Sequence, residues 1–255
     1  MRIIDKQHIE IYRELIGNQI AKLIDLFDFS EKTSDLGYKT QASAVYSSNI
    51  EGNSIDLNSF MNYKLSSGKI KAHKEVQEID NLIDAYKFAQ SNALTERNFL
   101  ECHKIFSKTL VIKSQQGKYR NDQVGVFSTS GLVYLAIEPQ FVNETMSEFF
   151  KDLKTLLNQD LSETETFYFA SLIHLIFAHI HPFRDGNGRA ARLLEKWFLS
   201  VKLGPDFWKV SSEKYYKEHQ MEYYSNINLG VNYYELNYAK CIPFLLMLPK
   251  SLEIK

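Results

Sequence analysis

The chain has 255 residues, of which 44% are hydrophobic and 24% are charged, and its formal net charge is −1. This length and composition are typical of a soluble globular protein with one domain or two closely packed ones. The small net charge argues against nucleic acid or an anionic membrane as a partner, because both attract strongly basic surfaces.

Apolar residues recur with helical spacing through most of the chain. They predict a first helix over 9–27 and a second over 38–50, which stops before the Gly52-Asn53 pair that favours a helix C-terminus. Ser162 and Glu165 have the spacing of a capping box, which predicts the start of a long apolar helix that runs to about His181. The other expected helices cover 75–90, 96–110, 144–158 and a stretch from about 188 onward.

One region departs from this helical pattern. Residues 124–127 and 132–137 are β-prone runs on either side of a Ser-Thr-Ser-Gly segment, which predicts a β-hairpin. The sequence therefore predicts an all-α helical bundle that carries one short hairpin over 124–137.

The stretch 181–192 reads His-Pro-Phe-Arg-Asp-Gly-Asn-Gly-Arg-Ala-Ala-Arg and concentrates more chemistry than any other. Pro182 disfavours helical geometry at His181, so the apolar helix should end there. Gly186 and Gly188 allow backbone amides to converge on an anion. The next helix begins at this point, and its N-terminus adds free N–H groups and a positive dipole end.

The charged side chains of this stretch suit a polyphosphate. Arg189 and Arg192 lie three residues apart on one helical face, and arginine binds phosphate oxygens with two parallel hydrogen bonds. Asp185 offers an oxygen ligand of the kind that Mg²⁺ accepts beside phosphates and waters. His181 can take a proton from an attacking hydroxyl. Together these residues predict nucleotide-dependent group transfer.

Two other chemistries fit the residues less well. A zinc site built from His174, His179 and His181 would need spacings of five and two, which do not match one helical face. A Walker-type phosphate loop is absent from the sequence.

The stretch 181–192 resembles the signature of the Fic family, His-x-Phe-x-Asp/Glu-Gly-Asn-Gly-Arg-x-x-Arg, at every fixed position. The resemblance extends through the preceding apolar helix and the hairpin and covers most of the chain. It implies a Fic-type helical bundle that transfers AMP from ATP to a Ser, Thr or Tyr hydroxyl of a target protein and releases pyrophosphate. The matching residues are His181, Phe183, Asp185, Gly186, Asn187, Gly188, Arg189 and Arg192.

The resemblance also implies a role for each of these residues. His181 is the expected general base, and Phe183 is expected to anchor the loop in the core. Asp185 is expected to hold Mg²⁺ or Mn²⁺ against the α- and β-phosphates. The other expected phosphate ligands are a nest made by Gly186, Asn187 and Gly188, and Arg189 and Arg192 on the β- and γ-phosphates.

Two further segments resemble nucleotide-contacting parts of the family. The hairpin resembles the flap that covers the nucleotide and can register a target segment by strand addition. Tyr223 and Tyr224 resemble a tyrosine pair that flanks the adenine, although simple packing remains an equal alternative for them. The flap residues expected near the nucleotide are Val126, Phe127, Ser128 and Thr129.

A second pattern of the family, Ser/Thr-x-x-x-Glu-Gly/Asn, is matched by residues 47–52 on the helix expected at about 38–52. Ser47 and Glu51 are four residues apart and so share one helical face. By resemblance, Glu51 pairs with Arg192, displaces the γ-phosphate and leaves ATP bound unproductively. The sequence therefore predicts an autoinhibited enzyme.

We expect three regions along the chain: an N-terminal helical region over 1–95, a Fic core over 96–204, and a C-terminal helical extension over 205–255 that packs on the core. The two cysteines have no metal-ligand spacing, and residues 1–16 lack a signal-peptide pattern, so we expect a cytoplasmic protein. A homo-oligomer stays open.

Several alternatives use the same site. Removal of AMP from a modified protein stays open because the inhibitory glutamate can position water, and UTP can replace ATP as donor. Transfer of the terminal phosphate belongs to a family branch with Lys in place of Gly188, which argues against it here. A non-catalytic nucleotide-binding interaction module is the alternative of a different class.

Overall fold

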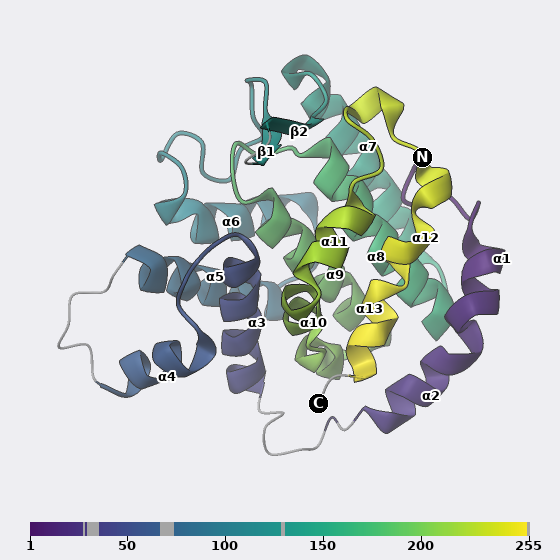
Figure 1. The fold of residues 1–255 in the computed structure, drawn as a ribbon, viewed down its shortest axis with the longest axis horizontal. Coiled ribbons are helices and arrows are strands. Elements are labelled where there is room, and N and C mark those ends of the chain that lie inside the picture. The colour runs from purple at the N-terminus through teal and green to yellow at the C-terminus, as the bar shows by residue number, and fades with distance from the viewer. Residues whose placement is uncertain (28, 30–35, 67–73, 129–130, 254–255) are drawn as a thin grey trace.

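Helix α8 (Glu163–Ile180) runs through the centre of the fold, and every residue from Thr166 to Phe177 is buried (Figure 1). The computed structural model of the protein describes residues 1–27, 29, 36–66, 74–128 and 131–253. Ser162 and Glu165 make the predicted capping box at the start of α8. Helix α9 (Asn187–Leu203) packs closely against α8, and the loop between the two helices carries the residues of the signature.

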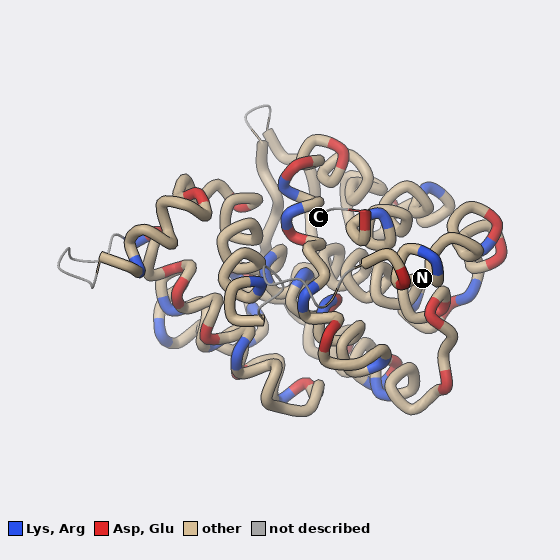
Figure 2. The backbone as a smooth tube through the Cα atoms, turned by 90° about the horizontal axis from the view of Figure 1, so that it is seen from below, with Lys and Arg blue, Asp and Glu red and all other residues tan. Residues whose placement is uncertain are grey.

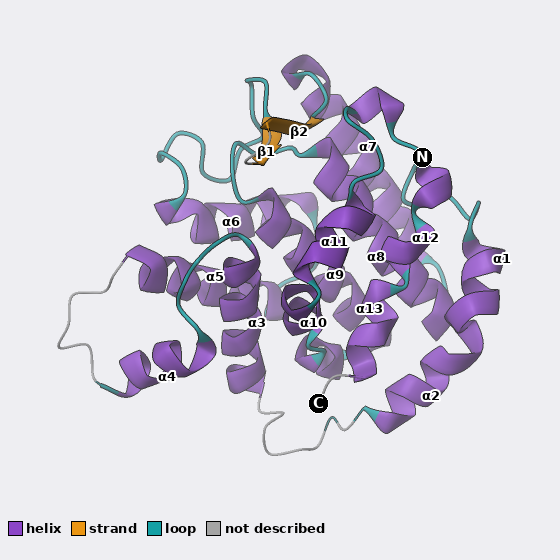
Figure 3. Cartoon of the chain, viewed as in Figure 1, coloured by secondary structure: helices purple, strands orange, loops and turns teal. Residues whose placement is uncertain are grey.

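The other helices surround this central pair (Figure 3). Along one edge, the chain from Ile9 to Leu26 forms α1, a single π-helical turn and α2, which matches the predicted first helix. Helices α3 to α6 lie on the opposite side (Figure 1). Bounds on the N-terminal side are α1 Ile9–Tyr12, α2 Asn18–Leu26, α3 Leu36–Ile50, α4 Leu57–Leu65, α5 Lys74–Gln90 and α6 Glu96–Phe106. Bounds on the C-terminal side are α7 Pro139–Asn158, α10 Ser212–Glu218, α11 Gln220–Ile227, α12 Ile242–Leu245 and α13 Met247–Lys250.

The predicted hairpin is present as two antiparallel strands, β1 (Gly125–Ser128) and β2 (Gly131–Leu135). Val126 pairs with Tyr134, and the register shifts after Val126 so that Phe127 pairs with Leu132. The far end of β2 is tied to the C-terminal region, because the backbone N–H of Leu135 donates to the carbonyl of Val231 at 2.9 Å. The hairpin thus projects from the bundle with β1 as its outer strand.

The fold class predicted from the sequence is confirmed, with small differences at two helix ends. Helix α7 begins at Pro139, five residues before the predicted start, because proline suits the first position of a helix. The helix expected over 96–110 ends at Phe106 and continues as a short 3₁₀ turn over 107–109.

Charged residues of both signs are interspersed along the described helices (Figure 2). Within the part of the chain that the structure describes, no helix is long and apolar enough to cross a membrane.

Candidate active site

Helix α8 ends at a residue in the left-handed backbone conformation. His181 has φ 53° and ψ 57°, and it is the only described residue other than glycine with a positive φ. Arg120 stabilises this conformation from outside: its Nε donates to the carbonyl of His181 at 2.8 Å, and its backbone N–H donates to the carbonyl of Pro182 at 2.9 Å. The predicted end of the helix before Pro182 is therefore confirmed, and the turn directs His181 away from the helix axis.

The hydrogen bonds of the His181 ring define its tautomer. Nδ1 lies 3.1 Å from the carbonyl oxygen of Ala178, which only accepts, so Nδ1 carries the proton. Nε2 is left with a free lone pair. Burial lowers the pKa of His181, and the positive charge of Arg120 lowers it further, against the opposing effect of the Ala178 bond. The ring is thus neutral near pH 7 and can act as a proton acceptor.

The loop is anchored in the core by Phe183, which is fully buried. Its ring stacks on His103, with centroids 3.6 Å apart and an interplanar angle of 11°. His103 Nε2 donates to the carbonyl of Asp185 at 3.1 Å, and its Nδ1 accepts from the N–H of Gly117 at 2.9 Å. Burial lowers the pKa of His103 to about 4, so the ring stays neutral and keeps this arrangement. His103 carries no separate signal in the sequence, because it falls within the apolar stripe of α6.

The start of α9 is fixed by side chains of the loop itself. Asn187 accepts from the backbone N–H of Phe183 at 2.8 Å and donates to its carbonyl at 2.9 Å. Gly186 has φ 84°, and a Cβ there would lie 2.7 Å from the ring of Phe106, so only glycine fits. The Asp185 side chain is exposed beside this turn, and its Oδ1 accepts from the N–H of Gly186 at 2.6 Å.

The two arginines of the signature are both buried and both paired with glutamates. Arg189 Nη2 lies 2.5 Å from Oε1 of Glu78 on α5, a partner for which the sequence carries no signal. Arg192 Nη2 lies 2.7 Å from Oε1 of Glu51, the pairing that the family pattern implied. Arg192 is fully buried, whereas the Glu51 side chain is 28% exposed. Glu51 therefore covers the solvent side of the Arg192 guanidinium.

Ser47 adds two more contacts from α3 to the same arginine. Arg192 Nε donates to Oγ of Ser47 at 2.9 Å, and Nη2 donates to its carbonyl at 3.0 Å. Burial tends to raise the pKa of Glu51, but the charges of Arg192 and Arg189 outweigh this effect, so the pKa is lowered. Ser47 lies in the last turn of α3 and Glu51 directly follows its last residue, and both side chains bind Arg192.

Glu51 also lies against the N-terminus of α9. A Cβ at Gly188 would lie 2.1 Å from Oε1 of Glu51, so a side chain at this position would displace the carboxylate. The last carbonyls of α3 are held from α10 and α11: Lys217 donates to Asn49 at 3.0 Å, while Gln220 and Tyr224 each donate to Ile50 at 2.8 Å. These contacts link the end of α3 to the C-terminal region.

A cavity of about 620 Å³ joins these parts. It lies between the end of α3, the hairpin, the His181 loop and α11, and its lining is mostly apolar on the hairpin and α11 sides. Of the predicted residues it brings together Glu51, Val126, Phe127, Ser128, His181, Gly188, Tyr223 and Tyr224.

The other predicted residues do not line this cavity. Arg192 and Ser47 lie behind Glu51, and Arg189 is turned toward Glu78. Asp185 is exposed on the loop, and Asn187 is buried beneath it. Thr129 falls outside the described residues.

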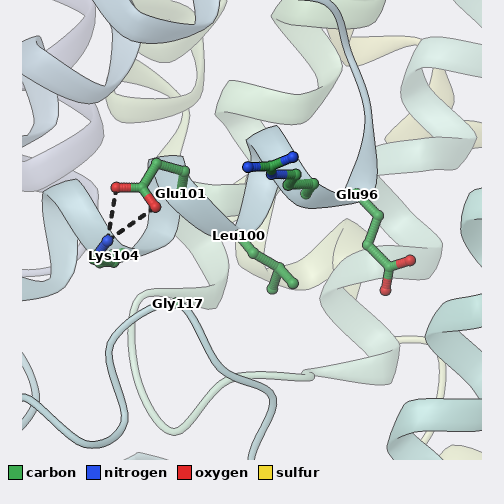
Figure 4. Close-up of a pocket in the computed structure, with 6 residues that line it drawn as sticks. Glu96, Leu100, Glu101, Lys104 and Gly117 are labelled. Carbon is green, nitrogen blue, oxygen red and sulfur yellow. Dashed lines mark hydrogen bonds and ion pairs between the residues drawn. The ribbon is translucent and has the colours of Figure 1, made fainter.

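A separate hollow of about 340 Å³ lies on α6, lined by residues such as Glu96, Leu100 and Lys104 with Gly117 opposite (Figure 4). It contains none of the predicted site residues. Its polar side chains are partly engaged with one another, because Lys104 Nζ lies 3.0 Å from both carboxylate oxygens of Glu101. The cavity beside His181 is therefore the candidate active site.

Within the described residues, no group of three or more His, Cys, Asp or Glu side chains could hold a metal ion. His174 and His179 are instead engaged separately: His174 contacts Glu195 and Tyr223, and His179 contacts Tyr238. This leaves Asp185 as a single exposed carboxylate, which fits a Mg²⁺ that takes its remaining ligands from phosphates and waters.

Residues 93–199 match the model of the Fic/DOC family. One relative by sequence is the protein adenylyltransferase Fic of Nematostella vectensis, which is 31% identical over 160 residues. The matched region covers 59% of this chain and 35% of that relative, so this chain spans only part of the relative's length.

Three solved structures share the fold. A Fic family protein from Desulfovibrio desulfuricans has a TM-score of 0.79 and 22% identity, with 95% of this chain and 73% of that chain covered. Fic-1 from C. elegans has a TM-score of 0.70 and 20% identity, with 96% and 70% covered. A Fic domain containing signaling protein from Bacteroides thetaiotaomicron has a TM-score of 0.63 and 20% identity, with 97% and 93% covered. At these identities the likeness shows the fold alone.

Proposed function

We propose that this chain is an autoinhibited protein adenylyltransferase, which transfers AMP from ATP to a Ser, Thr or Tyr hydroxyl of a target protein. One observation carries the proposal: a single cavity of about 620 Å³ is bordered by the neutral His181, by the N-terminus of α9 and by Glu51 on Arg192. A proton acceptor, an anion-binding helix end and a carboxylate on a phosphate-binding arginine form a nucleotide site with its own inhibitor. The relative named as an adenylyltransferase supports the choice of reaction.

The chain's own residues account for each change in bonding. His181 Nε2 takes the proton from the target hydroxyl, whose oxygen attacks the α-phosphorus. The new P–O bond forms as the bond between the α-phosphorus and the α,β-bridging oxygen breaks, and pyrophosphate leaves with that oxygen. The free N–H groups at the start of α9 and the guanidiniums of Arg189 and Arg192 would bind the phosphate chain. Asp185 would hold a Mg²⁺ or Mn²⁺ ion, which neutralises charge on the phosphates when bound.

The inhibited state follows from the occupancy of Arg192. The terminal phosphate of ATP and the carboxylate of Glu51 compete for the exposed side of one buried guanidinium. While Glu51 occupies it, the phosphate chain lacks this ligand, and the α-phosphorus is not held in line with His181. The transfer rate should therefore be low in the intact chain and rise when Glu51 is removed.

The test compares the intact chain, Glu51→Gly, and Glu51→Gly combined with His181→Ala. Each is incubated with ATP, Mg²⁺ and a cell lysate, and intact-mass and peptide mass spectrometry measure the group added. We expect Glu51→Gly to add the mass of AMP to itself or to a target, and the double variant to add none while still binding ATP.

Other outcomes distinguish the alternatives. Equal modification by the intact chain and Glu51→Gly would overturn the autoinhibition, and addition of UMP or phosphate would overturn the choice of AMP transfer. If a purified AMP-modified target loses AMP only when Glu51 is present, the chain is a de-AMPylating hydrolase. ATP binding with no modification in any variant would indicate a non-catalytic module.

A further inference from the structure

A buried network of hydrogen-bonded polar side chains begins at Arg192 and leads away from the cavity. Arg192 Nη1 lies 3.2 Å from the hydroxyl of Tyr223, which lies 2.9 Å from Nε2 of His174. His174 Nδ1 lies 2.8 Å from Oε2 of Glu195, and the hydroxyl of Tyr216 also donates to this carboxylate. All five side chains are at most 2% exposed. This network joins α8, α9, α10 and α11.

The direction of every hydrogen bond in this network follows from its first residue, Arg192. A guanidinium only donates, so the Tyr223 oxygen accepts from Arg192 and its O–H is given to His174. Nε2 of His174 must then accept, and its proton lies on Nδ1, which donates to Glu195. Burial raises the pKa of Tyr223, which keeps its proton on the hydroxyl. Each nitrogen and oxygen atom named along this path has a hydrogen-bond partner, which favours a single arrangement of these side chains.

Tyr223 differs from the other hydrogen-bond partners of Arg192 in one respect. Ser47 and Glu51, which supply the remaining hydrogen bonds to the guanidinium, both belong to the α3 segment. Tyr223 is the only described partner of Arg192 that does not depend on α3. If Glu51 withdraws, Tyr223 keeps Nη1 in place, and the N–H of Nη2 that binds Glu51 is freed for a phosphate while the other N–H keeps its bond to the Ser47 carbonyl.

We propose that Tyr223, His174 and Glu195 are positioning residues that orient Arg192 toward the terminal phosphate of the nucleotide once Glu51 has left. This inference rests on the proposed function and extends it to residues outside the signature. Tyr223 then serves the phosphate end of the site through its hydroxyl, and the adenosine end does not depend on that hydroxyl.

The prediction is a selective loss of ATP affinity. In the Glu51→Gly background, the Kd values for ATP and AMP are measured by calorimetric titration for Tyr223→Phe and for His174→Asn. Phe keeps the ring that lines the cavity, and Asn keeps the donor to Glu195 but cannot reach Tyr223. Loss of one hydrogen bond that orients Arg192 should raise the Kd for ATP roughly fivefold or more, with AMP binding unchanged.

The matched control is Tyr168→Phe, which removes another buried hydroxyl, one that donates to the carbonyl of Asp5 at 3.1 Å on the far side of α8. It should leave the ratio of the two Kd values at that of the parent. His174 does not line the cavity, so a selective effect of His174→Asn cannot come from a lost ligand contact.

Three results would overturn the inference. One is an equal loss of ATP and AMP affinity in both variants, which would indicate general damage to the pocket. Another is an unchanged Kd for ATP in both variants. A third is the failure of the Glu51→Gly parent to bind ATP at all, which would overturn the proposed function itself and is recognised before either tyrosine or histidine is changed.

Discussion

Replacing Glu51 by Gln keeps the size of the side chain and removes its charge. The contact that changes is the 2.7 Å ion pair with Arg192, whose guanidinium is fully buried. A hydrogen bond between charged groups contributes about 1.5–3 kcal/mol, and Gln can still accept weakly while Ser47 and Tyr223 retain their bonds. We therefore expect the free energy of unfolding to fall by about 1.5–3 kcal/mol.

The same contact sets the gain in nucleotide affinity. A phosphate that no longer competes with the Glu51 carboxylate can gain at most the free energy that the ion pair contributed, which corresponds to roughly ten- to 150-fold in Kd for ATP. Urea unfolding of both proteins gives the first quantity, and titration with ATP gives the second. The two must change in opposite senses, with the gain in binding no larger than the loss of stability.

Glu101→Gln is the matched control for removal of a paired carboxylate. Its ion pair with Lys104 lies at the surface, where the two side chains are 41% and 56% exposed, so the change should cost under about 1 kcal/mol and leave ATP binding unaltered. If Glu51→Gln lowers stability by the expected amount but leaves the Kd for ATP unchanged, then Glu51 and the phosphate do not compete for Arg192.

Two more predictions follow from contacts around the site. Gln220→Ala removes a donor to the carbonyl of Ile50 at the end of α3, which loosens the segment that carries Glu51. The lost hydrogen bond contributes about 0.5–1.5 kcal/mol, so the rate of basal self-modification with labelled ATP should rise a few-fold. A rate equal to that of the intact chain would contradict this link between α11 and Glu51. The second concerns the pH profile: because burial lowers the pKa of His181 below 6.5, the neutral base persists at that pH and is lost only on further acidification. The rate of the Glu51→Gly variant should exceed half of its plateau value at pH 6.5, and a half-maximal rate reached at or above pH 6.5 would refute the assignment of the base.

The helices and the loop of the site could be predicted because their signals are local. Pro182 fixes the end of α8, and the spacing of Ser47 and Glu51 predicts that their side chains lie close together. The pairing of Glu51 with Arg192 came from resemblance to a family, because residues 141 positions apart are brought together only by packing.

The contacts that could not be predicted from the sequence lie between helices. His103 has helical spacing with Phe99 and Phe106, so periodicity marks it as one more member of a buried stripe and says nothing of its bond to Asp185. Glu78 on Arg189 and the path from Tyr223 to Glu195 each depend on how two or more helices cross. The division at residues 95 and 204 stays a prediction.

The presence of Glu51 and Arg192 in one polypeptide determines how the proposed activity depends on protein and ATP concentration. Both residues belong to one chain, so the local concentration of the carboxylate around the guanidinium is fixed by covalent linkage and does not fall on dilution. A nucleotide meets the same guanidinium from solution, at whatever concentration prevails there. Under the proposed function, the amount of protein sets the total activity, whereas the ATP concentration sets the fraction of molecules in the active arrangement.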